Sequence, residues 1–196
     1  MGESASDGDI TARIAERVRN LRGARGLTLD ELAERSGVSR AMLSKIERGE
    51  SSPTAVMLDR VASGLNTSLA SLFDAPTAVT PLYKRAEQNS WRDPDSGYLR
   101  RNLSAPGIES PLQLALVTFP ARTRLAYDSP PRAGGLDQQV WMIEGTIEIG
   151  VGDARFKLSE GDCLAMQLDQ PVYFHNKSKA PARYLVATVT GTSKRS

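Results

Sequence analysis

The chain has 196 residues, with 40% hydrophobic and 24% charged side chains and a formal net charge of +2 at pH 7, a composition typical of a soluble globular protein. No apolar run reaches the roughly 18–20 residues of a membrane span, and the acidic N-terminal segment has no secretory signal, so we expect a cytoplasmic protein with no membrane partner. One cysteine, Cys163, excludes an internal disulfide, and one histidine, His175, leaves too few ligands for a zinc site of histidine and cysteine.

The first part of the chain has the spacing of a small helical domain. After a flexible tail over residues 1–9, apolar side chains recur every three or four residues through residues 10–74, which is typical of amphipathic helices. Capping residues and glycines divide this stretch into five predicted helices, which form a compact all-α unit. These signals are Thr28 with Glu31, Ser39, Thr54 after Pro53, and Ser68 at the starts, and Gly26, Gly37 and Gly49 at the ends.

The rest of the chain changes to short strands. Residues 75–110 contain scattered prolines and arginines, and we expect a linker and the first strands there. Over residues 111–190, β-rich runs alternate with glycine, aspartate and proline turns, which indicates an all-β sandwich or barrel. The predicted strands are residues 112–119, 140–143, 146–151, 155–158, 163–166, 172–174 and 184–189.

A demanding spacing lies inside the helical half. Two helices that meet at a sharp angle need a small residue at their contact, here Ala33, and a turn residue that tolerates positive φ, here Gly37. The segment LTLDELAERSGVSRAMLSKIERGESSPT resembles the helix-turn-helix of the phage repressor and Cro type, the XRE family, and the resemblance covers residues 10–73. It implies a transcriptional regulator of double-stranded DNA. The alternative is a helical hairpin used only for packing.

In this family the second helix of the motif enters the major groove, and here that helix covers residues 39–48. The resemblance assigns base contacts to Arg40, Ala41 and Lys45, with Ser44 on the same face. An arginine or lysine can bond guanine, and an alanine methyl can contact thymine. We therefore expect this helix to read an operator, and a dimer to bind a near-palindromic site.

A second set of residues is better placed for the phosphate backbone, which fixes register without reading sequence. The resemblance assigns this role to Thr28, Ser39 and Arg48. One departure is visible, because the family often has a phosphate-binding glutamine where this chain has Leu29.

Glu47 needs a separate interpretation, because a carboxylate on a DNA-facing helix repels phosphate unless it is turned inward or paired. Family members pair it with an arginine of the first helix, and Arg22 is the matching position. We therefore predict a structural pair between Arg22 and Glu47. The alternative is an exposed pair of little energetic value.

The β half resembles the small cupin barrel, a double-stranded β-helix. The resemblance rests on residues 138–149, 158–163 and 171–176, where the glycine turns at Gly145 and Gly161 and the final Asn176 match well. The sequence thus predicts two domains, an N-terminal five-helix helix-turn-helix domain and a C-terminal all-β cupin barrel.

The metal ligands of the cupin family do not match. Residues 131–135 contain no histidine, Gln138 stands at the glutamate position, and Val172 stands at the second-motif histidine position. His175 lies three residues too late, on the opposite face of its strand. We therefore expect no metal and no cofactor. A metal-dependent oxygenase or epoxidase fused to the helix-turn-helix domain is the rival interpretation, and it would need two histidines and a carboxylate.

Strand alternation predicts which side chains face the barrel interior. If Gln138 points inward as a cupin ligand does, the apolar floor is formed by Val140, Met142, Val172 and Phe174. Trp141 then faces outward, against the second sheet or a partner. Cys163, in an apolar strand, is expected to be a small buried side chain.

Polar groups at the mouth would orient a ligand in this cavity. We assign that role to Gln138 and to whichever of Arg122, Arg124 and Tyr127 borders the mouth. Arginines beside an apolar cavity favour a small anionic effector. The sequence therefore predicts a homodimeric, ligand-responsive transcriptional regulator, and the alternative of a DNA-binding scaffold with no effector stays open.

Overall fold

The computed structural model describes residues 7–73, 80–108, 110–128 and 136–190. The described helices are α1 (Asp7–Ala24), α2 (Leu29–Ser36), α3 (Arg40–Glu47), α4 (Ala55–Gly64) and the 3-10 helix η1 (Ala70–Phe73). None of them is both long enough and apolar enough to span a bilayer. The predicted flexible tail over residues 1–9 lies largely outside the described residues, and α1 already begins at Asp7. Residues 131–135, where the cupin family has its first histidine ligands, lie wholly outside them.

The fifth predicted helix is wrong in type, because it is a single 3-10 turn rather than an α-helix. Ser68 caps this turn as predicted, since its hydroxyl accepts a hydrogen bond from the N–H of Ser71 at 3.2 Å. Only four residues belong to η1. So short a segment gains little from α-helical hydrogen bonds, and single 3-10 turns are common connectors of this length.

Local sequence sets the ends of the two motif helices. The Thr28 hydroxyl accepts from the N–H of Glu31 and the Glu31 carboxylate accepts from the N–H of Thr28, which completes the predicted capping box. Gly37 has φ 66° and ends α2 by donating its N–H to the carbonyl of Ala33. Ser39 then caps α3 by accepting from the N–H of Met42.

The helical domain is held by close packing of α2 against α4. Leu32, Leu43 and Leu58 are completely buried between the helices. At Gly64 the approach is so close that a Cβ atom would lie 2.8 Å from the Cβ of Ser36. A side chain at this position would therefore push α4 away from α2.

Ten strands in the described ranges form two antiparallel sheets. One has the order β1-β2-β3-β10-β5-β8 and the other β4-β9-β6-β7. The pairing of β10 between β3 and β5 is the strand order of a jelly roll, the double-stranded β-helix of the cupin barrel. The strands are β1 (Ser90–Arg92), β2 (Leu99–Asn102), β3 (Leu112–Phe119), β4 (Thr123–Tyr127), β5 (Leu136–Glu144), β6 (Thr146–Val151), β7 (Ala154–Ser159), β8 (Cys163–Gln167), β9 (Val172–Asn176) and β10 (Ala182–Thr190).

The strand pattern agrees well with the prediction, and β3 and β6 have the predicted bounds. Strand β4 was not predicted from the sequence. Along β5, Val140 and Met142 are completely buried, whereas Trp141 between them is 48% exposed. Trp141 therefore faces outward as predicted, and of the two predicted neighbours, the second sheet or a partner, its exposure leaves the partner. The outer face of β5 leaves it open to solvent.

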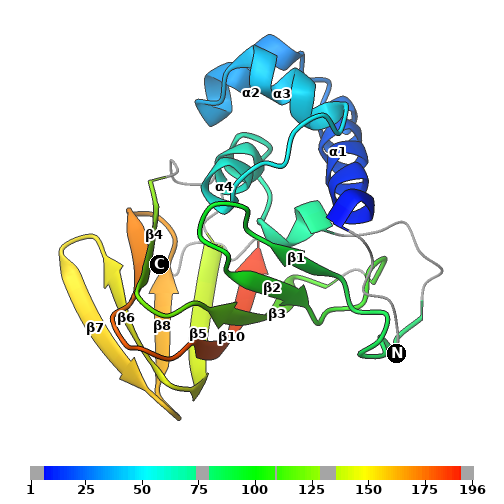
Figure 1. Cartoon of the computed structure of the whole chain (residues 1–196). Coiled ribbons are helices and arrows are strands. Elements are labelled where there is room, and N and C mark those ends of the chain that lie inside the picture. The colour runs from blue at the N-terminus through cyan, green and yellow to red at the C-terminus, as the bar shows by residue number, and fades with distance from the viewer. Residues whose placement is uncertain (1–6, 74–79, 109, 129–135, 191–196) are drawn as a thin grey trace, which may run out of the picture.

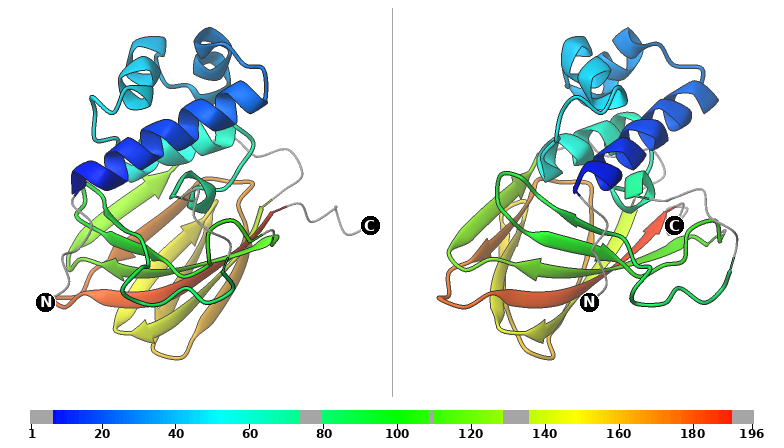
Figure 2. Two further views of the ribbon diagram at one scale, coloured as in Figure 1. Left: turned by 90° about the vertical axis from the view of Figure 1, so that its right-hand side faces the viewer. Right: turned by 45° about the vertical axis from the view of Figure 1, so that its right-hand side comes forward.

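The helical domain lies on one end of the barrel, with α4 near the strands and α2 and α3 farthest from them (Figures 1 and 2). Arg60 on α4 forms an ion pair with Asp128, which follows β4, at 2.7 Å. Aromatic rings continue across the junction, because Phe73 contacts Trp91 at 5.4 Å and Trp91 contacts Tyr98 at 5.8 Å between ring centroids. The two domains thus share one packed boundary.

Candidate nucleic-acid interface and barrel cavity

Helix α3 lies on the part of the helical domain farthest from the barrel (Figure 1). Leu43 is completely buried against the other helices, while Arg40, Ala41 and Lys45 are exposed. Residues at these positions of a helix share one face, and half-buried Ser44 lies among them. The structure therefore brings the four predicted base-contacting residues to one outward surface.

The positive charges on this surface differ in their partners. Arg40 pairs with Asp30 through an Nε to Oδ1 distance of 3.1 Å, and both side chains are more than 60% exposed. Arg48 donates to the Glu50 carboxylate at 2.7 Å. Lys45 has no ion pair within the described ranges. Exposed pairs add little to stability, so a phosphate or a base can replace the carboxylates.

The hydroxyls at the two helix starts already have partners. Thr28 donates its hydroxyl to the Glu31 carboxylate at 2.8 Å, and the hydrogen bond from the Thr28 N–H is the main reason why the pKa of Glu31 lies below its ordinary value. A phosphate near Thr28 would therefore meet a negative charge. Ser39 is exposed and has no such acidic neighbour on its hydroxyl. Ser39 is thus the better placed of the two for phosphate.

Arg22 and Glu47 form a buried two-point pair. The Arg22 Nε lies 2.6 Å from one Glu47 carboxylate oxygen and its Nη2 lies 2.9 Å from the other. The remaining Nη1 donates to the carbonyl of Leu27 at 2.7 Å, and Glu47 is only 6% exposed. The carboxylate is therefore turned inward, and it adds no negative charge to the outward surface of α3.

A cavity lies where the barrel mouth meets the helical domain. Its walls come from strands β2, β3, β4, β5, β9 and β10, and its roof comes from Asp59 on α4 and from Ser68, Leu69 and Ala70 around η1. The cavity volume is about 80 Å³. By the same measure, a site for one water molecule needs roughly 10–15 Å³. It can therefore hold a small ligand of a few heavy atoms.

Four of the predicted pocket residues line this cavity, namely Tyr127, Gln138, Val172 and Phe174. Val140 and Met142 face the same interior but are completely buried in the core and do not line it. The alternation along β5 thus placed these side chains on the inner face. How far along the strand the cavity extends depends on which neighbours fill the barrel.

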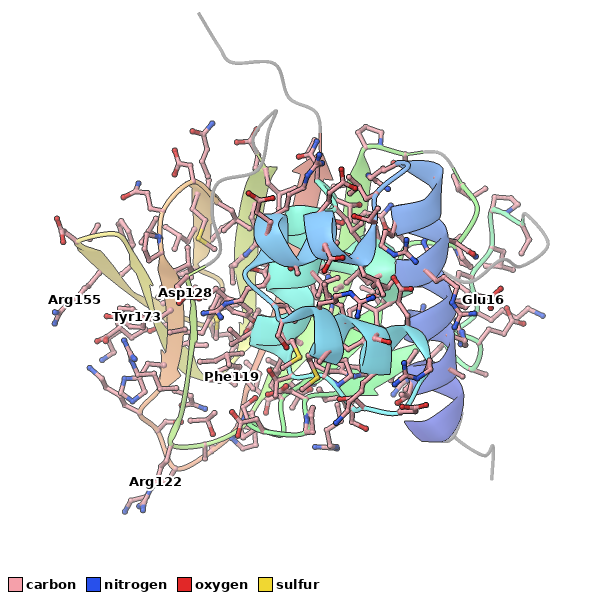
Figure 3. The ribbon with its side chains drawn as sticks, turned by 90° about the horizontal axis from the view of Figure 1, so that it is seen from above. Glu16, Phe119, Arg122, Asp128, Arg155 and Tyr173 are labelled. Carbon is pink, nitrogen blue, oxygen red and sulfur yellow. The ribbon has the colours of Figure 1, made fainter. Side chains whose placement is uncertain are left out.

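The assignment of Arg122 and Arg124 to the cavity mouth is wrong. Arg122 lies in the turn before β4 with φ 54° and points away from the molecule (Figure 3). Arg124 lies on the outer face of β4, because Leu125 beside it is buried, and its guanidinium stacks 4.5 Å from the centroid of the Tyr173 ring. Tyr127, on the same face as Leu125, does line the cavity.

The arginine that lines the cavity is Arg100 on β2, which the sequence interpretation missed. It is 7% exposed, and its Nε is buried with no hydrogen-bond partner among the described residues. Arg100 and Arg101 are neighbours in the segment predicted as a linker and the first strands, whose bounds the sequence did not give, so alternation alone does not say which arginine faces inward. The strand pairing decides the direction, because Arg100 lies opposite the buried Val117 of β3 and directly paired residues point to the same face of a sheet.

Three tyrosines border the cavity beside Arg100. Burial raises the pKa of Tyr98, Tyr127 and Tyr184 above its ordinary value of 10.0, and most strongly for the last two. The Arg100 charge opposes this shift of the pKa at Tyr98 and Tyr184, both of which line the same cavity as Arg100. The three phenols therefore stay neutral near pH 7 and can donate hydrogen bonds.

The barrel residues that the structure describes do not fit a catalytic metal ion. Gln138 and Val172 stand at the positions where cupins hold metal, and an amide and an isopropyl group supply neither imidazole nor carboxylate. Over the described ranges, no three side chains of histidine, cysteine, aspartate or glutamate gather in a metal-binding cluster. Cys163 is exposed on β8, so the expectation of a buried thiol is wrong, because it lies on the outer face opposite Trp141.

Comparison with known proteins agrees with this architecture. The helix-turn-helix family HTH_3 matches residues 18–72. The HTH-type transcriptional regulator SutR of Escherichia coli (strain K12) is 28% identical over 173 residues, which cover 83% of this chain and 92% of that protein. An uncharacterized HTH-type transcriptional regulator of Sinorhizobium fredii is 36% identical over 77 residues, which cover 39% of this chain and 99% of that protein.

A solved structure extends the similarity to both domains. The HTH_3 family transcriptional regulator from Vibrio cholerae superposes with a TM-score of 0.75 and 27% identity, covering 94% of this chain and 98% of that one. The matched helices include α2 and α3, whose geometry is described above. The chain therefore belongs to the XRE-type (HTH_3) family of helix-turn-helix, DNA-binding transcriptional regulators, in which it joins the helical domain to a cupin barrel.

Proposed function

We propose that the protein is a cytoplasmic regulator that binds a near-palindromic operator as a homodimer and responds to a small molecule held in its barrel. Helix-turn-helix dimers read two half-sites about one helical turn apart, roughly 34–36 Å. The observation that carries the proposal is the exposed polar face of α3, a helix that lies at the end of the molecule away from the barrel (Figure 1).

In this proposal Arg40 and Lys45 reach base edges, with Ala41 and Ser44 between them. Arg40 first exchanges its Asp30 partner for the edge of a guanine, which costs little because the pair is exposed. Lys45 approaches as a point charge, unpaired within the described part of the chain.

Phosphate contacts in this proposal come chiefly from Ser39 and from Arg48. Arg48 must release Glu50 to reach a phosphate, and the exposure of both groups makes that exchange easy. Thr28 must release Glu31 before it can reach a phosphate, because both its hydroxyl and its backbone N–H donate to the Glu31 carboxylate.

A second copy of this chain is the partner that we assign to the outer face of β5. Trp141 is 48% exposed there, and its cross-strand neighbours are Leu185 and Cys163. Large exposed aromatic side chains with apolar neighbours are typical of interface centres. Trp141→Lys should therefore convert a dimer to monomers in analytical ultracentrifugation, whereas Phe156→Lys on β7, also an exposed aromatic, should leave the dimer intact.

The cavity supports a sensing role over a scaffold role. Its wall combines Arg100, tyrosine hydroxyls and Gln138 with apolar side chains, which is the usual composition of a small-molecule site. A scaffold barrel would be filled by its own side chains. The rival metal-dependent enzyme has no support from Gln138 and Val172, so we propose a regulator that is not an enzyme.

The decisive experiment is sequencing of the genomic fragments that the purified protein retains. We expect enrichment of a short motif with two-fold symmetry, and loss of that enrichment in the double variant Arg40→Ala/Lys45→Ala. Arg155→Ala, an exposed arginine on β7, is the matched control and should retain the same fragments. Random retention by the wild type, or equal retention by the double variant, would overturn the proposal.

A further inference from the structure

The cavity is bounded by both domains, which makes it more than a barrel interior. Asp59, on the barrel-facing side of α4, and Leu69, just before η1, form part of its roof. Val117 of β3 and Val186 of β10 are apolar side chains of the barrel that line the same cavity. A molecule in this cavity would therefore touch the DNA-binding domain and the barrel at the same time.

Arg100 has a hydrogen-bond donor in the cavity wall that lacks an acceptor. A guanidinium that is more than nine-tenths buried normally has hydrogen-bond acceptors for its N–H groups, because an unpaired buried donor costs free energy. The Arg100 Nε has no acceptor among the described residues. The neighbouring hydroxyls of Tyr98 and Tyr184 are neutral and can add donors. This set of donors is complementary to an anion with planar oxygens.

We propose that the cavity binds a small aliphatic carboxylate, with its oxygens on Arg100 and its hydrocarbon part against Val117 and Val186, and that Asp59 makes α4 sensitive to its presence. The inference rests on the proposed regulator function and names both the ligand class and the switch. The size of the ligand follows from the cavity volume, which admits only a few heavy atoms.

The switch follows from charge. Asp59 is 8% exposed and lines the same cavity, so a bound carboxylate places a second negative group close to it in a poorly screened environment. Like charges at short range favour an arrangement in which α4 lies farther from the barrel. A ligand shifts an equilibrium only through such a difference in affinity between two arrangements. The carboxylate thereby changes the position of the domain that carries α3.

Binding is tested with propionate, butyrate, isobutyrate and valerate against the corresponding primary amides, which have nearly the same shape without the charge. Calorimetry and NMR titration should detect the carboxylates and not the amides. Arg100→Met should weaken butyrate binding roughly tenfold or more. Arg101→Met is the matched control, since it lies on the same strand with an equally unpaired Nε on the other face, and it should bind butyrate normally.

Three outcomes would overturn the site: none of the carboxylates binds, the amides bind equally well, or the Arg100 and Arg101 variants behave alike. Circular dichroism first establishes that each variant is folded. If Arg100→Met is not folded, Arg100→Lys replaces it, because it keeps the charge and loses the planar two-point contact. That variant should also bind butyrate more weakly than the wild type does.

The switch is tested separately on the full chain. Butyrate should change hydrogen exchange in α4 and η1, and should change operator affinity by about five- to 150-fold, the usual range of such coupling. Asp59→Asn should bind butyrate more tightly, because the repulsion is gone, and should lose most of the effect on operator affinity. Protection confined to the barrel strands would overturn the role of Asp59.

The two proposals fail in different ways. If butyrate binds through Arg100 but the protein retains no specific DNA, the regulator proposal fails and the carboxylate site stands. If specific DNA is retained but no carboxylate binds, the site fails and the regulator proposal stands.

Discussion

The carboxylate of Asp93 accepts a hydrogen bond from the backbone N–H of Ala55 at 2.7 Å, so a residue that follows strand β1 caps the start of helix α4. Asp93 is completely buried, and its other oxygen accepts from the N–H of Ser96 at 2.8 Å. A negative charge at a helix start is favourable because the free N–H groups there carry partial positive charge. The barrel side of the molecule therefore holds the helix that roofs the cavity.

Asp93→Ala should lower the free energy of unfolding by about 1–3 kcal/mol, because the Ala55 N–H stays buried without an acceptor. Asp93→Asn keeps an acceptor oxygen and should cost less. Urea denaturation measures both, with Asp95→Ala, an exposed neighbour, as the control. Equal stability of Asp93→Ala and the control would show that α4 does not depend on this cap.

Arg22→Met should destabilise the helical domain by about 2–3 kcal/mol, somewhat less than the roughly 3–5 kcal/mol for a fully buried pair, because Arg22 is 20% exposed. The loss arises because Glu47 stays buried without its partner. Thermal unfolding of Arg22→Met, Arg22→Met/Glu47→Gln and the exposed control Arg25→Met measures the effect. The double variant should recover part of the loss, and no recovery would contradict the pairing argument.

Arg40→Ala should weaken operator binding by about 1–3 kcal/mol and relax the preference at one base position. Arg48→Ala should instead weaken binding to all sequences alike and reduce the salt dependence by about one unit of slope. Binding titrations on the operator and on random DNA at several salt concentrations separate the two. A uniform loss for Arg40→Ala would mean that Arg40 contacts phosphate only.

Protein purified without chelator should contain well under one equivalent of iron, manganese, nickel or zinc. The reason is that Gln138 and Val172 replace the glutamate and histidine at cupin ligand positions. Elemental analysis by mass spectrometry checks this directly. A stoichiometric metal that survives dialysis would restore the enzyme hypothesis.

The buried tyrosines predict loss of stability at alkaline pH. Burial raises the folded-state pKa of Tyr127 and Tyr184 well above the unfolded value near 10.0, so the unfolded chain releases these protons first. Stability from this source is fully present below that value and falls as pH rises beyond it. Denaturation followed by tyrosinate absorbance should show a smaller loss in Tyr127→Phe/Tyr184→Phe, and an unchanged pH dependence would contradict the assignment.

Features that depend on nearby residues were predictable from the sequence. Thr28 and Glu31 cap α2 from three residues apart, and Gly37 ends the same helix. The alternation along β5 likewise predicted that Val140 faces inward and Trp141 outward. Each feature is decided within a few bonds of backbone geometry, so a single sequence is enough to predict it.

The sequence by itself determined the helix-turn-helix domain, the exposed polar face of α3 and the barrel, because repeated spacing and local caps specify them. Only the tertiary structure decided that Arg100 rather than Arg124 enters the cavity, that Cys163 is exposed, and that Asp93 caps a helix in the other domain. These features depend on strand register and on contacts between segments far apart in the chain. Such contacts form only when distant strands pair or the two domains pack, and no local pattern in the sequence encodes them.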